Sequence, residues 1–354
     1  MCRIVFFKRC TWKRRGKINT RQNKVVTLSE AIQEYVKDGS HISIGGFTIN
    51  RNPMAAVYEI IRQGVRDLHL YAHSNGQGAD ELIGAGCVSR MDIAYGGNGK
   101  YAATCIRFRK AVQEGTLQVE DYSNFHMVLR FMAGAMGVPF LPTVSGLGTD
   151  LANVWGFSEE MRKQDPKLPN RKMVTMDNPF DNWLNTPKVV LVPAIQTDVT
   201  ILHVQQADKQ GTGRILGLTF ADVEQAKSSK HLILTCEELV DTQELRRNPD
   251  QNNIPFIHVD AVVHVPYGAF PTACYRHYDY DPTCLWAYAE AAKDDRLYGE
   301  YLRKMILGVR NHEEFIALNG GPERLERIKA DPETGYAVNL SRGKGGDNGG
   351  LFTA

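Results

Sequence analysis

The pattern of apolar and polar positions predicts alternating helices and strands from Thr27 onward. Thr27-Leu28-Ser29-Glu30 has the form of a capping box, and apolar residues then recur at helical spacing until Gly39. A short apolar run follows at 41–44 and predicts a buried strand. Further along, the pattern predicts a helix that starts at Pro53, strands at 67–71 and 91–95, and a helix at 79–85.

A glycine-containing loop follows each of these three strands. The loops are Gly45-Gly46-Phe47, residues 73–78 (HSNGQG) and residues 95–99 (YGGNG). Strand, glycine loop and helix in repeated succession are typical of a parallel sheet with crossover helices, and such sheets bind ligands at the carboxyl ends of their strands. We therefore expect an α/β fold, an open α/β/α sandwich with a mainly parallel sheet.

The rest of the chain predicts a helix, an irregular excursion and a second α/β block. The helix is expected at 124–137 and the excursion at about 139–187. The second block is expected to contain strands at 188–192, 198–204, 231–236 and 259–265, a helix at 221–228, and closing helices at 284–308 and 311–330. This predicts one folded domain over 25–340, between a basic leader at 1–24 and a glycine-rich tail at 341–354.

Charge is distributed unevenly between the leader and the body. Residues 1–24 hold nine Lys or Arg and no acid, which leaves 33 basic against 40 acidic residues in the rest of the chain. An acidic body argues against a nucleic-acid-binding protein. No run of about 18 apolar residues predicts a membrane span. Seven cysteines without a CxxC pair indicate reduced thiols, so we expect a cytoplasmic protein.

Backbone amides and small polar side chains are the candidate ligand-binding groups. Gly45, Gly46 and Phe47 could present N–H groups to an oxyanion or a phosphate, although a glycine pair also suits an ordinary strand-to-helix turn. The polar loops offer Asn75, Gly76, Gln77, Gly78 and Asn98. These residues could contact a carboxylate or could simply form solvated turns.

Signatures of metal binding, nucleotide binding or nucleophilic catalysis do not emerge from the sequence. Neither GxGxxG nor a Walker sequence occurs, and no Ser–His, Cys–His or paired-carboxylate pattern is visible. His203 lies in a predicted buried strand. A metal role would need partner ligands at suitable spacing, and the alternative is a buried histidine with both nitrogens hydrogen-bonded. We expect no bound metal.

Several segments together resemble the α subunits of family I coenzyme A transferases, and in particular the glutaconate-type α subunit. The similarity runs in order from about Lys24 to Leu340. It rests on residues 44–53 (IGGFTINRNP), 107–110 (RFRK), 176–180 (MDNPF), 203–208 (HVQQAD), 260–263 (DAVV) and 266–271 (PYGAFP).

The resemblance implies an active site shared between an α and a β subunit, in a heterotetramer or hetero-octamer. Coenzyme A esters would be the substrates, with no permanently bound cofactor. A glutamate of the β subunit would be the nucleophile, and turnover would be ping-pong through a glutamyl-CoA thioester. Gly45, Gly46 and Phe47 match the family's oxyanion glycine motif, and Asn98 matches a family asparagine.

The resemblance places no catalytic residue in this chain. Single-chain members of the family carry the glutamate in a Ser-Glu-Asn-Gly segment, whereas this chain has Ser74-Asn75-Gly76, and Glu81 lies beyond it on a predicted helix. The implied reaction is acyl-CoA:carboxylate CoA transfer to a dicarboxylate such as glutaconate, with acetyl-CoA as donor. Two alternatives stay open: a CoA-ester ring hydrolase of the same fold, and a non-catalytic sensor domain for a small acid.

Overall fold

The computed structural model describes residues 22–180, 185–338 and 340–341. Residues 1–21 of the predicted leader and 342–354 of the predicted tail lie outside this range. Lys24, which the sequence grouped with the leader, belongs to the folded body instead. Its side chain is buried, and its Nζ donates hydrogen bonds to the carbonyl oxygens of Phe256 (2.7 Å) and Val259 (2.8 Å).

The main sheet has eight strands in the part of the chain that the structure describes. Its order is β11-β10-β8-β1-β2-β3-β4, all parallel, with the short β9 antiparallel to β8. The expected mainly parallel sheet is therefore confirmed. The strands are β1 (His41–Ile44), β2 (Leu68–Asn75), β3 (Val88–Gly96), β4 (Gln118–Asp121), β8 (Thr197–Asp208), β9 (Gly213–Arg214), β10 (Ser229–Val240) and β11 (Ala261–His264).

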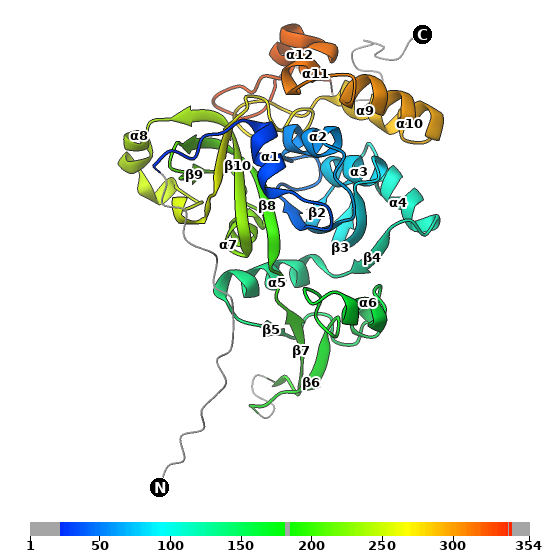
Figure 1. Cartoon of the computed structure of the whole chain (residues 1–354). Coiled ribbons are helices and arrows are strands. Elements are labelled where there is room, and N and C mark those ends of the chain that lie inside the picture. The colour runs from blue at the N-terminus through cyan, green and yellow to red at the C-terminus, as the bar shows by residue number, and fades with distance from the viewer. Residues whose placement is uncertain (1–21, 181–184, 339, 342–354) are drawn as a thin grey trace.

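Helices cover both faces of this sheet (Figure 1). On the upper face lie α1 (Leu28–Tyr35), α2 (Met54–Arg62) and α3 (Gln77–Gly84), and on the lower face α5 (Asn124–Met136) and α7 (Asp222–Lys227). The remaining helices are α4 (Ile106–Gln113), α6 (Glu159–Gln164), α8 (Thr242–Arg247), α9 (Pro282–Ala291), α10 (Asp295–Tyr301), the π-helical η5 (Leu302–Ile306), α11 (His312–Leu318) and α12 (Gly321–Ile328), with 3-10 turns η1 (Asp150–Ala152), η3 (Pro249–Gln251) and η4 (Phe256–His258).

Local sequence explains where the first helices begin. The capping box predicted at the start of α1 is present: Glu30 N–H donates to Thr27 Oγ1, and Thr27 N–H donates to the Glu30 carboxylate. Pro53 is the N-cap of α2, where its missing N–H costs nothing because the first amides of a helix have no partner inside it.

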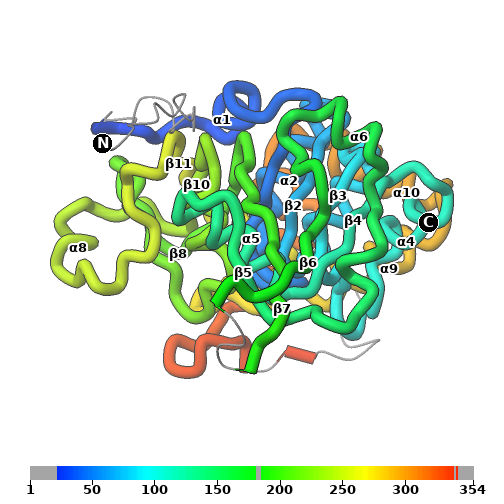
Figure 2. The backbone as a smooth tube through the Cα atoms, turned by 90° about the horizontal axis from the view of Figure 1, so that it is seen from below, coloured from blue at the N-terminus to red at the C-terminus, as the bar shows by residue number. Residues whose placement is uncertain are grey.

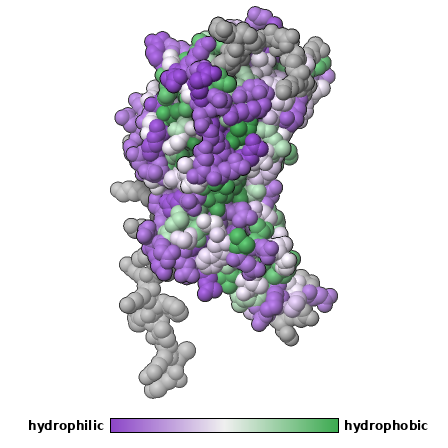
Figure 3. Space-filling view, turned by 90° about the vertical axis from the view of Figure 1, so that its right-hand side faces the viewer, coloured by the Kyte–Doolittle hydropathy of each residue, from purple (hydrophilic) through white to green (hydrophobic). Residues whose placement is uncertain are grey.

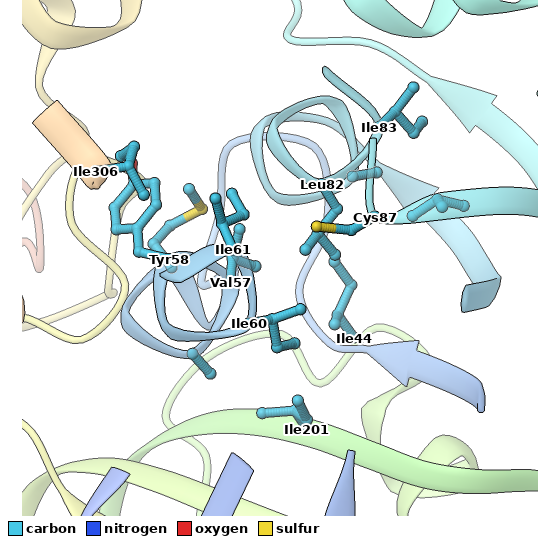
Figure 4. Packing of buried hydrophobic residues seen from close by; sticks show 14 of the residues in the cluster. Ile44, Val57, Tyr58, Ile60, Ile61, Leu82, Ile83, Cys87, Ile201 and Ile306 are labelled. Atoms are coloured by element: carbon cyan, nitrogen blue, oxygen red, sulfur yellow. The ribbon is translucent and has the colours of Figure 1, made fainter. Parts of the chain in front are cut away.

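The core lies between the sheet and the upper helices. Ile44 of β1 and Ile201 of β8 point toward Val57 and Ile60 of α2, and Leu82 of α3 packs beside them (Figure 4). All five side chains are at most 1 % exposed. This packing fixes α2 and α3 against the strands whose carboxyl ends carry the candidate site.

A second, antiparallel sheet projects below α5. Its order is β5-β7-β6, with β5 (Phe140–Thr143), β6 (Val174–Asp177) and β7 (Lys188–Pro193), and it lies in front of the main sheet in Figure 2. The segment expected to be irregular therefore contains two of these strands and α6. In Figure 3, hydrophobic residues gather on the surface between the upper body and this lower lobe. In the interior, Met127 and Phe131 of α5 pack in one buried cluster with Val190 and Val192 of β7.

No helix among the described residues is long and apolar enough to cross a membrane.

Candidate active site

The switch point of the main sheet lies between β1 and β8. From β1 the chain builds β2, β3 and β4 on one side, and from β8 it builds β10 and β11 on the other. Ligands of open α/β sheets bind outside the carboxyl ends of the strands at such a point. Gly45, Gly46 and Phe47 follow β1 directly, so the topology places them where the sequence predicted a site.

The amides of this turn already have acceptors inside the chain. Gly45 N–H donates to the carbonyl of Ile201 (3.0 Å), and Phe47 N–H donates to the carbonyl of Asn50 (2.9 Å). Gly46 N–H donates to Oδ1 of Asp222 (3.0 Å). An oxyanion could use one of these amides only by sharing or replacing its present acceptor, so the oxyanion role of the turn stays a prediction.

The backbone conformation at position 46 requires a glycine. Its φ of +84° lies in the left-handed region, and a Cβ there would come within 2.4 Å of the Asn50 carbonyl oxygen and 2.6 Å of that of Arg51. A side chain at this position would therefore break the turn as well as any ligand site beside it.

An ion pair that the sequence analysis did not single out holds this turn in place. Arg51 Nη1 lies 2.7 Å from Oδ2 of Asp222 and donates also to the His203 carbonyl, while Nη2 donates to the Leu218 carbonyl. Both side chains are at most 3 % exposed. Burial raises the pKa of Asp222, whereas Arg51 and the Gly46 amide favour its charged form. Arg51 lies within the segment 44–53 that carried the family resemblance, so its position was a usable signal.

The second loop is shorter than expected. Residues 73–75 belong to β2, and α3 begins at Gln77, so Gly76 alone joins the strand to the helix. Asn75 is buried, donates to the Gly45 carbonyl and accepts from Ala79 N–H. Gly78 N–H donates to Oδ1 of Asn52 (3.0 Å). The buried polar side chains resemble those of a loop in composition, which is why the sequence suggested one.

The structure brings Gln77 and Asn98 together behind Gly76. Asn98 Nδ2 donates to Oε1 of Gln77 (2.9 Å), and Gln77 Nε2 donates to Oε1 of Glu81 (3.0 Å). Oδ1 of Asn98 is buried without a partner and lies only 2.1 Å from where a Cβ of Gly76 would be. Gln77 is therefore placed to support the strand end, and Asn98 packs directly against Gly76.

Glu81 is a buried carboxyl group at the base of this network. It is 0 % exposed, and its Oε1 accepts from Tyr301 Oη (2.7 Å) as well as from Gln77, whereas Oε2 has no partner. Burial raises the pKa of Glu81 to about 8, against the hydrogen bonds that favour the charged form. A neutral carboxyl group held by tyrosine is a poor nucleophile, which agrees with the expectation that Glu81 is not catalytic.

An aromatic surface borders the turn. The Phe47 ring stacks on Phe220 at a centroid distance of 5.1 Å and lies 5.6 Å from the His73 ring. Phe47 and Phe220 are partly exposed. Burial lowers the pKa of His73, so this imidazole is neutral at pH 7. Phe220 could not be singled out from the sequence, because it precedes the predicted helix and belongs to no motif.

His203 has both ring nitrogens in hydrogen bonds, as the non-metal interpretation expected. Nδ1 lies 2.8 Å from Thr235 Oγ1, and Nε2 lies 2.6 Å from Glu237 Oε1. Cys274 is close enough to complete a three-residue metal site. However, both ring nitrogens of His203 already have hydrogen-bond partners, and the Glu237 carboxylate also accepts from the Tyr278 hydroxyl and the Tyr267 amide. The donor set therefore fits a hydrogen-bonded core better than a metal centre.

A second group, His41, His69 and Asp165, also comes within ligating distance. It lies at the opposite, amino end of the strands, since His41 and His69 occupy the starts of β1 and β2. Asp165 already pairs with His41 (2.9 Å) and Arg90 (2.8 Å).

Fold and site together define an α/β protein whose parallel sheet carries a cluster of glycines and buried polar side chains at its carboxyl edge, where proteins of this architecture bind ligands. The family described as coenzyme A transferase matches residues 25–265. Because this match covers more than half of the chain, the chain belongs to the coenzyme A transferase family, and the resemblance drawn from the sequence is confirmed.

Individual relatives agree. One subunit of the glutaconate CoA-transferase of Acidaminococcus fermentans is 41 % identical over 320 residues, covering 90 % of this chain and 99 % of the relative. The crystal structure of that organism's glutaconate coenzyme A-transferase superposes with a TM-score of 0.85 over 89 % of this chain and 98 % of the other. One subunit of the 3-oxoadipate CoA-transferase of Pseudomonas knackmussii is 31 % identical, covering 83 % of this chain and 97 % of the relative. The cholesterol ring-cleaving hydrolase IpdA subunit of Rhodococcus jostii is 27 % identical, covering 82 % of this chain and 94 % of the relative.

Proposed function

We propose that this chain is the α subunit of a heteromeric acyl-CoA:carboxylate CoA-transferase in the cytoplasm. The acceptor is a dicarboxylate such as glutaconate, and the donor is acetyl-CoA. Two relatives named as subunits of CoA-transferases support the reaction class, since this chain aligns with 97 % or more of the length of each. Their names support a second subunit, and their substrates support a dicarboxylate of five or six carbons.

The observation that carries the two-subunit proposal is the state of three buried carboxyl groups at or behind the carboxyl edge. Glu81 is enclosed by Tyr301 and Gln77, and Asp222 is paired with Arg51. Glu237 accepts hydrogen bonds from three groups, namely the His203 ring, the Tyr278 hydroxyl and the Tyr267 amide. None of the three can approach a thioester without losing these partners, which agrees with the implication of the family resemblance that the attacking carboxylate comes from another chain.

The reaction then proceeds by double displacement. The partner's glutamate carboxylate attacks the thioester carbonyl carbon, the C–S bond breaks, and CoA leaves as a thiolate while an acyl-glutamyl anhydride forms. The thiolate attacks the glutamyl carbonyl carbon and displaces the acyl group as a free carboxylate. The acceptor carboxylate reverses both steps, which regenerates the glutamate and releases the new thioester without net oxidation or proton change.

This chain contributes one wall of the site. Gly45, Gly46 and Phe47 border the place where the thioester oxygen develops charge, and an N–H donor there would be worth about 3 kcal/mol. Asn75, Gly76, Gln77, Gly78 and Asn98 shape the neighbouring strand end.

The test is to trap the intermediate in the assembled enzyme. The chain is co-expressed with the protein encoded beside it, and the complex is incubated with acetyl-CoA without acceptor. We expect mass spectrometry to find CoA on a glutamate of the partner and none on this chain. The isolated chain should exchange no labelled acetate into acetyl-CoA. CoA attached to Glu81, or transfer by the isolated chain, would refute the proposal.

A second candidate function is hydrolysis of a CoA ester. It is favoured by the similarity to the cholesterol ring-cleaving hydrolase subunit of Rhodococcus jostii. The two functions differ in the acceptor, because a hydrolase uses water. Turnover of an acyl-CoA that does not depend on added carboxylate would establish the hydrolase and exclude the transferase.

A further inference from the structure

A pocket of about 300 Å³ opens beside the Gly45–Phe47 turn. Most of its wall is apolar or aromatic. The residues that matter for its shape are Asn50, Leu216, Leu218, Phe220, Tyr275 and Tyr336. Small-molecule sites in proteins have this size and this mixture of apolar walls with a few polar groups.

Hydrogen bonds connect three loops that line the pocket. The first contains Leu216, the second contains Ala273 and Tyr275, and the third contains Arg51. Gln205 of β8 is 0 % exposed and uses its carboxamide to hold both walls. Its Nε2 donates to the carbonyls of Leu216 and Tyr275, and its Oε1 accepts from Leu216 N–H. Arg51 N–H donates to the Ala273 carbonyl (2.7 Å), which ties the third loop to the second. These bonds make the pocket a preformed feature of the chain.

Two glycines leave room for the ring that forms one wall. A Cβ at Gly217 would lie 2.8 Å from the Tyr275 ring, and a Cβ at Gly335 would lie 2.3 Å from it. The ring is therefore held in a slot between two stretches of backbone. Tyr336, whose ring centroid is 5.3 Å from that of Tyr275, stands at the rim and is 57 % exposed.

The charge inside the pocket is compensated. Arg51 lines it, but its guanidinium is paired with buried Asp222 and donates to two carbonyls. Asn50 and the tyrosines offer neutral polar groups. This environment favours the hydrocarbon part of an acyl chain, because burying apolar surface is favourable. Burying an unpaired charge is costly, so a terminal carboxylate would have to lie outside the apolar wall.

The pocket adjoins the turn at which the thioester is proposed to bind. Asn50 and Phe47 exchange backbone hydrogen bonds of 2.8 and 2.9 Å, and the Phe220 ring stacks on the Phe47 ring. Phe47 of the turn therefore directly contacts two residues of the pocket wall, Asn50 and Phe220.

We propose that this pocket receives the hydrocarbon part of the acyl chain, the carbons beyond the thioester carbonyl, and so sets which chain lengths the enzyme accepts. The inference rests on the proposed transferase function. The far end of such an acyl chain is either a methyl group, as in hexanoyl-CoA, or a carboxylate, as in glutaryl-CoA. Kinetics with these two substrates show which end group the pocket accepts.

The test narrows the pocket with Ala273→Leu, a substitution of a residue that lines it, in the assembled α–β complex. Steady-state kinetics are measured with acetyl-CoA, hexanoyl-CoA and glutaryl-CoA. The matched control is Ala317→Leu, which adds the same atoms to a pocket of similar volume, about 330 Å³, beside α11 and α12. Thermal unfolding confirms that both variants are folded and assembled.

We expect Ala273→Leu to leave kcat/KM for acetyl-CoA within about two-fold and to lower kcat/KM for at least one longer substrate by about 10-fold or more, the usual effect of a few methylene groups in an apolar pocket. Ala317→Leu should change neither. If Ala273→Leu fails to fold, Tyr336→Ala at the exposed rim takes its place. Relative to the wild-type complex, Tyr336→Ala should raise the ratio of kcat/KM for phenylacetyl-CoA to kcat/KM for acetyl-CoA by several-fold.

Equal effects on acetyl-CoA and both longer substrates, or no effect on any, would overturn the pocket assignment while leaving the transferase function intact. Failure of the proposed transferase function can be distinguished from failure of the pocket assignment, because calorimetry measures the binding of hexanoyl-CoA without turnover. If the wild-type complex transfers no CoA but Ala273→Leu still weakens that binding about 10-fold, the pocket assignment stands and the proposed reaction falls.

Discussion

The Glu81→Gln substitution tests the buried network behind Gly76. Glutamine has the shape of a protonated glutamate, so its carbonyl oxygen can keep the hydrogen bonds from Tyr301 and Gln77, while its NH₂ group takes the place of the unpartnered Oε2. The variant removes only the ability to ionise. Any difference between the two proteins that depends on pH therefore reports the protonation of Glu81.

The expected size follows from the pKa of Glu81, which burial raises to about 8 from 4.5. The unfolded chain loses this proton first as the pH rises, so the folded state becomes relatively less stable between about pH 4.5 and 8. Because each pKa unit corresponds to about 1.4 kcal/mol, wild type should lose roughly 3 kcal/mol relative to the variant between pH 5 and 8. Above pH 8 the difference should level off.

Urea unfolding of both proteins at pH 5, 6, 7 and 8 measures this difference. Asp80, the neighbouring buried acid, is present in both proteins, so its own titration largely cancels in the comparison. Glu34→Gln, on the exposed side of α1, serves as the control for the chemical change alone. Parallel stability curves for wild type and Glu81→Gln would mean that Glu81 is already ionised in the fold and that the reasoning is wrong.

Three further predictions concern the turn and the leader. Gly46→Ala should lower the free energy of unfolding by about 3 kcal/mol, because a left-handed φ and a backbone clash both oppose the new side chain, and activity should fall as well. The control is Gly39→Ala, where φ is also left-handed but no atom lies close to the added Cβ. It should lower the free energy of unfolding by about 1 kcal/mol in the same urea measurement. Arg51→Met should cost about 3–5 kcal/mol by leaving Asp222 unpaired, and Asp222→Asn in the same chain should recover part of this loss in thermal unfolding. Removal of residues 1–21 should leave assembly, followed by size-exclusion chromatography, and turnover unchanged, because the family match begins at residue 25; loss of the partner would show that the leader takes part in assembly.

The alternating part of the fold could be predicted because its local signals agree. The first strands are short apolar runs, and capping or glycine residues mark where α1 begins and where β1 ends. The insertion of β8 between β1 and β10 was not predictable, because strand order depends on long-range packing. It nevertheless decides the site, since it creates the switch point beside Gly45.

The small sheet escaped prediction for a physical reason. The side chains of β6 are mostly exposed, so the strand lacks the alternation of buried and exposed residues that marks a strand in sequence. Its pairing with β7 supplies the order instead. Residues 73–78 show the opposite error, because buried Ser74, Asn75 and Gln77 have the composition of a loop but complete a strand and start a helix.

The site itself could be located from sequence but its hydrogen bonds could not. A glycine pair after a strand indicates amides near a ligand, and it says nothing about what those amides bind in the free chain. Here the Gly46 amide donates to Asp222, the same carboxylate that holds Arg51. If a thioester oxygen takes this amide, Asp222 keeps Arg51 and loses its backbone partner. Substrate binding and the Arg51–Asp222 pair would therefore be energetically coupled, and both the geometry of the turn and the wall of the acyl pocket depend on that pair.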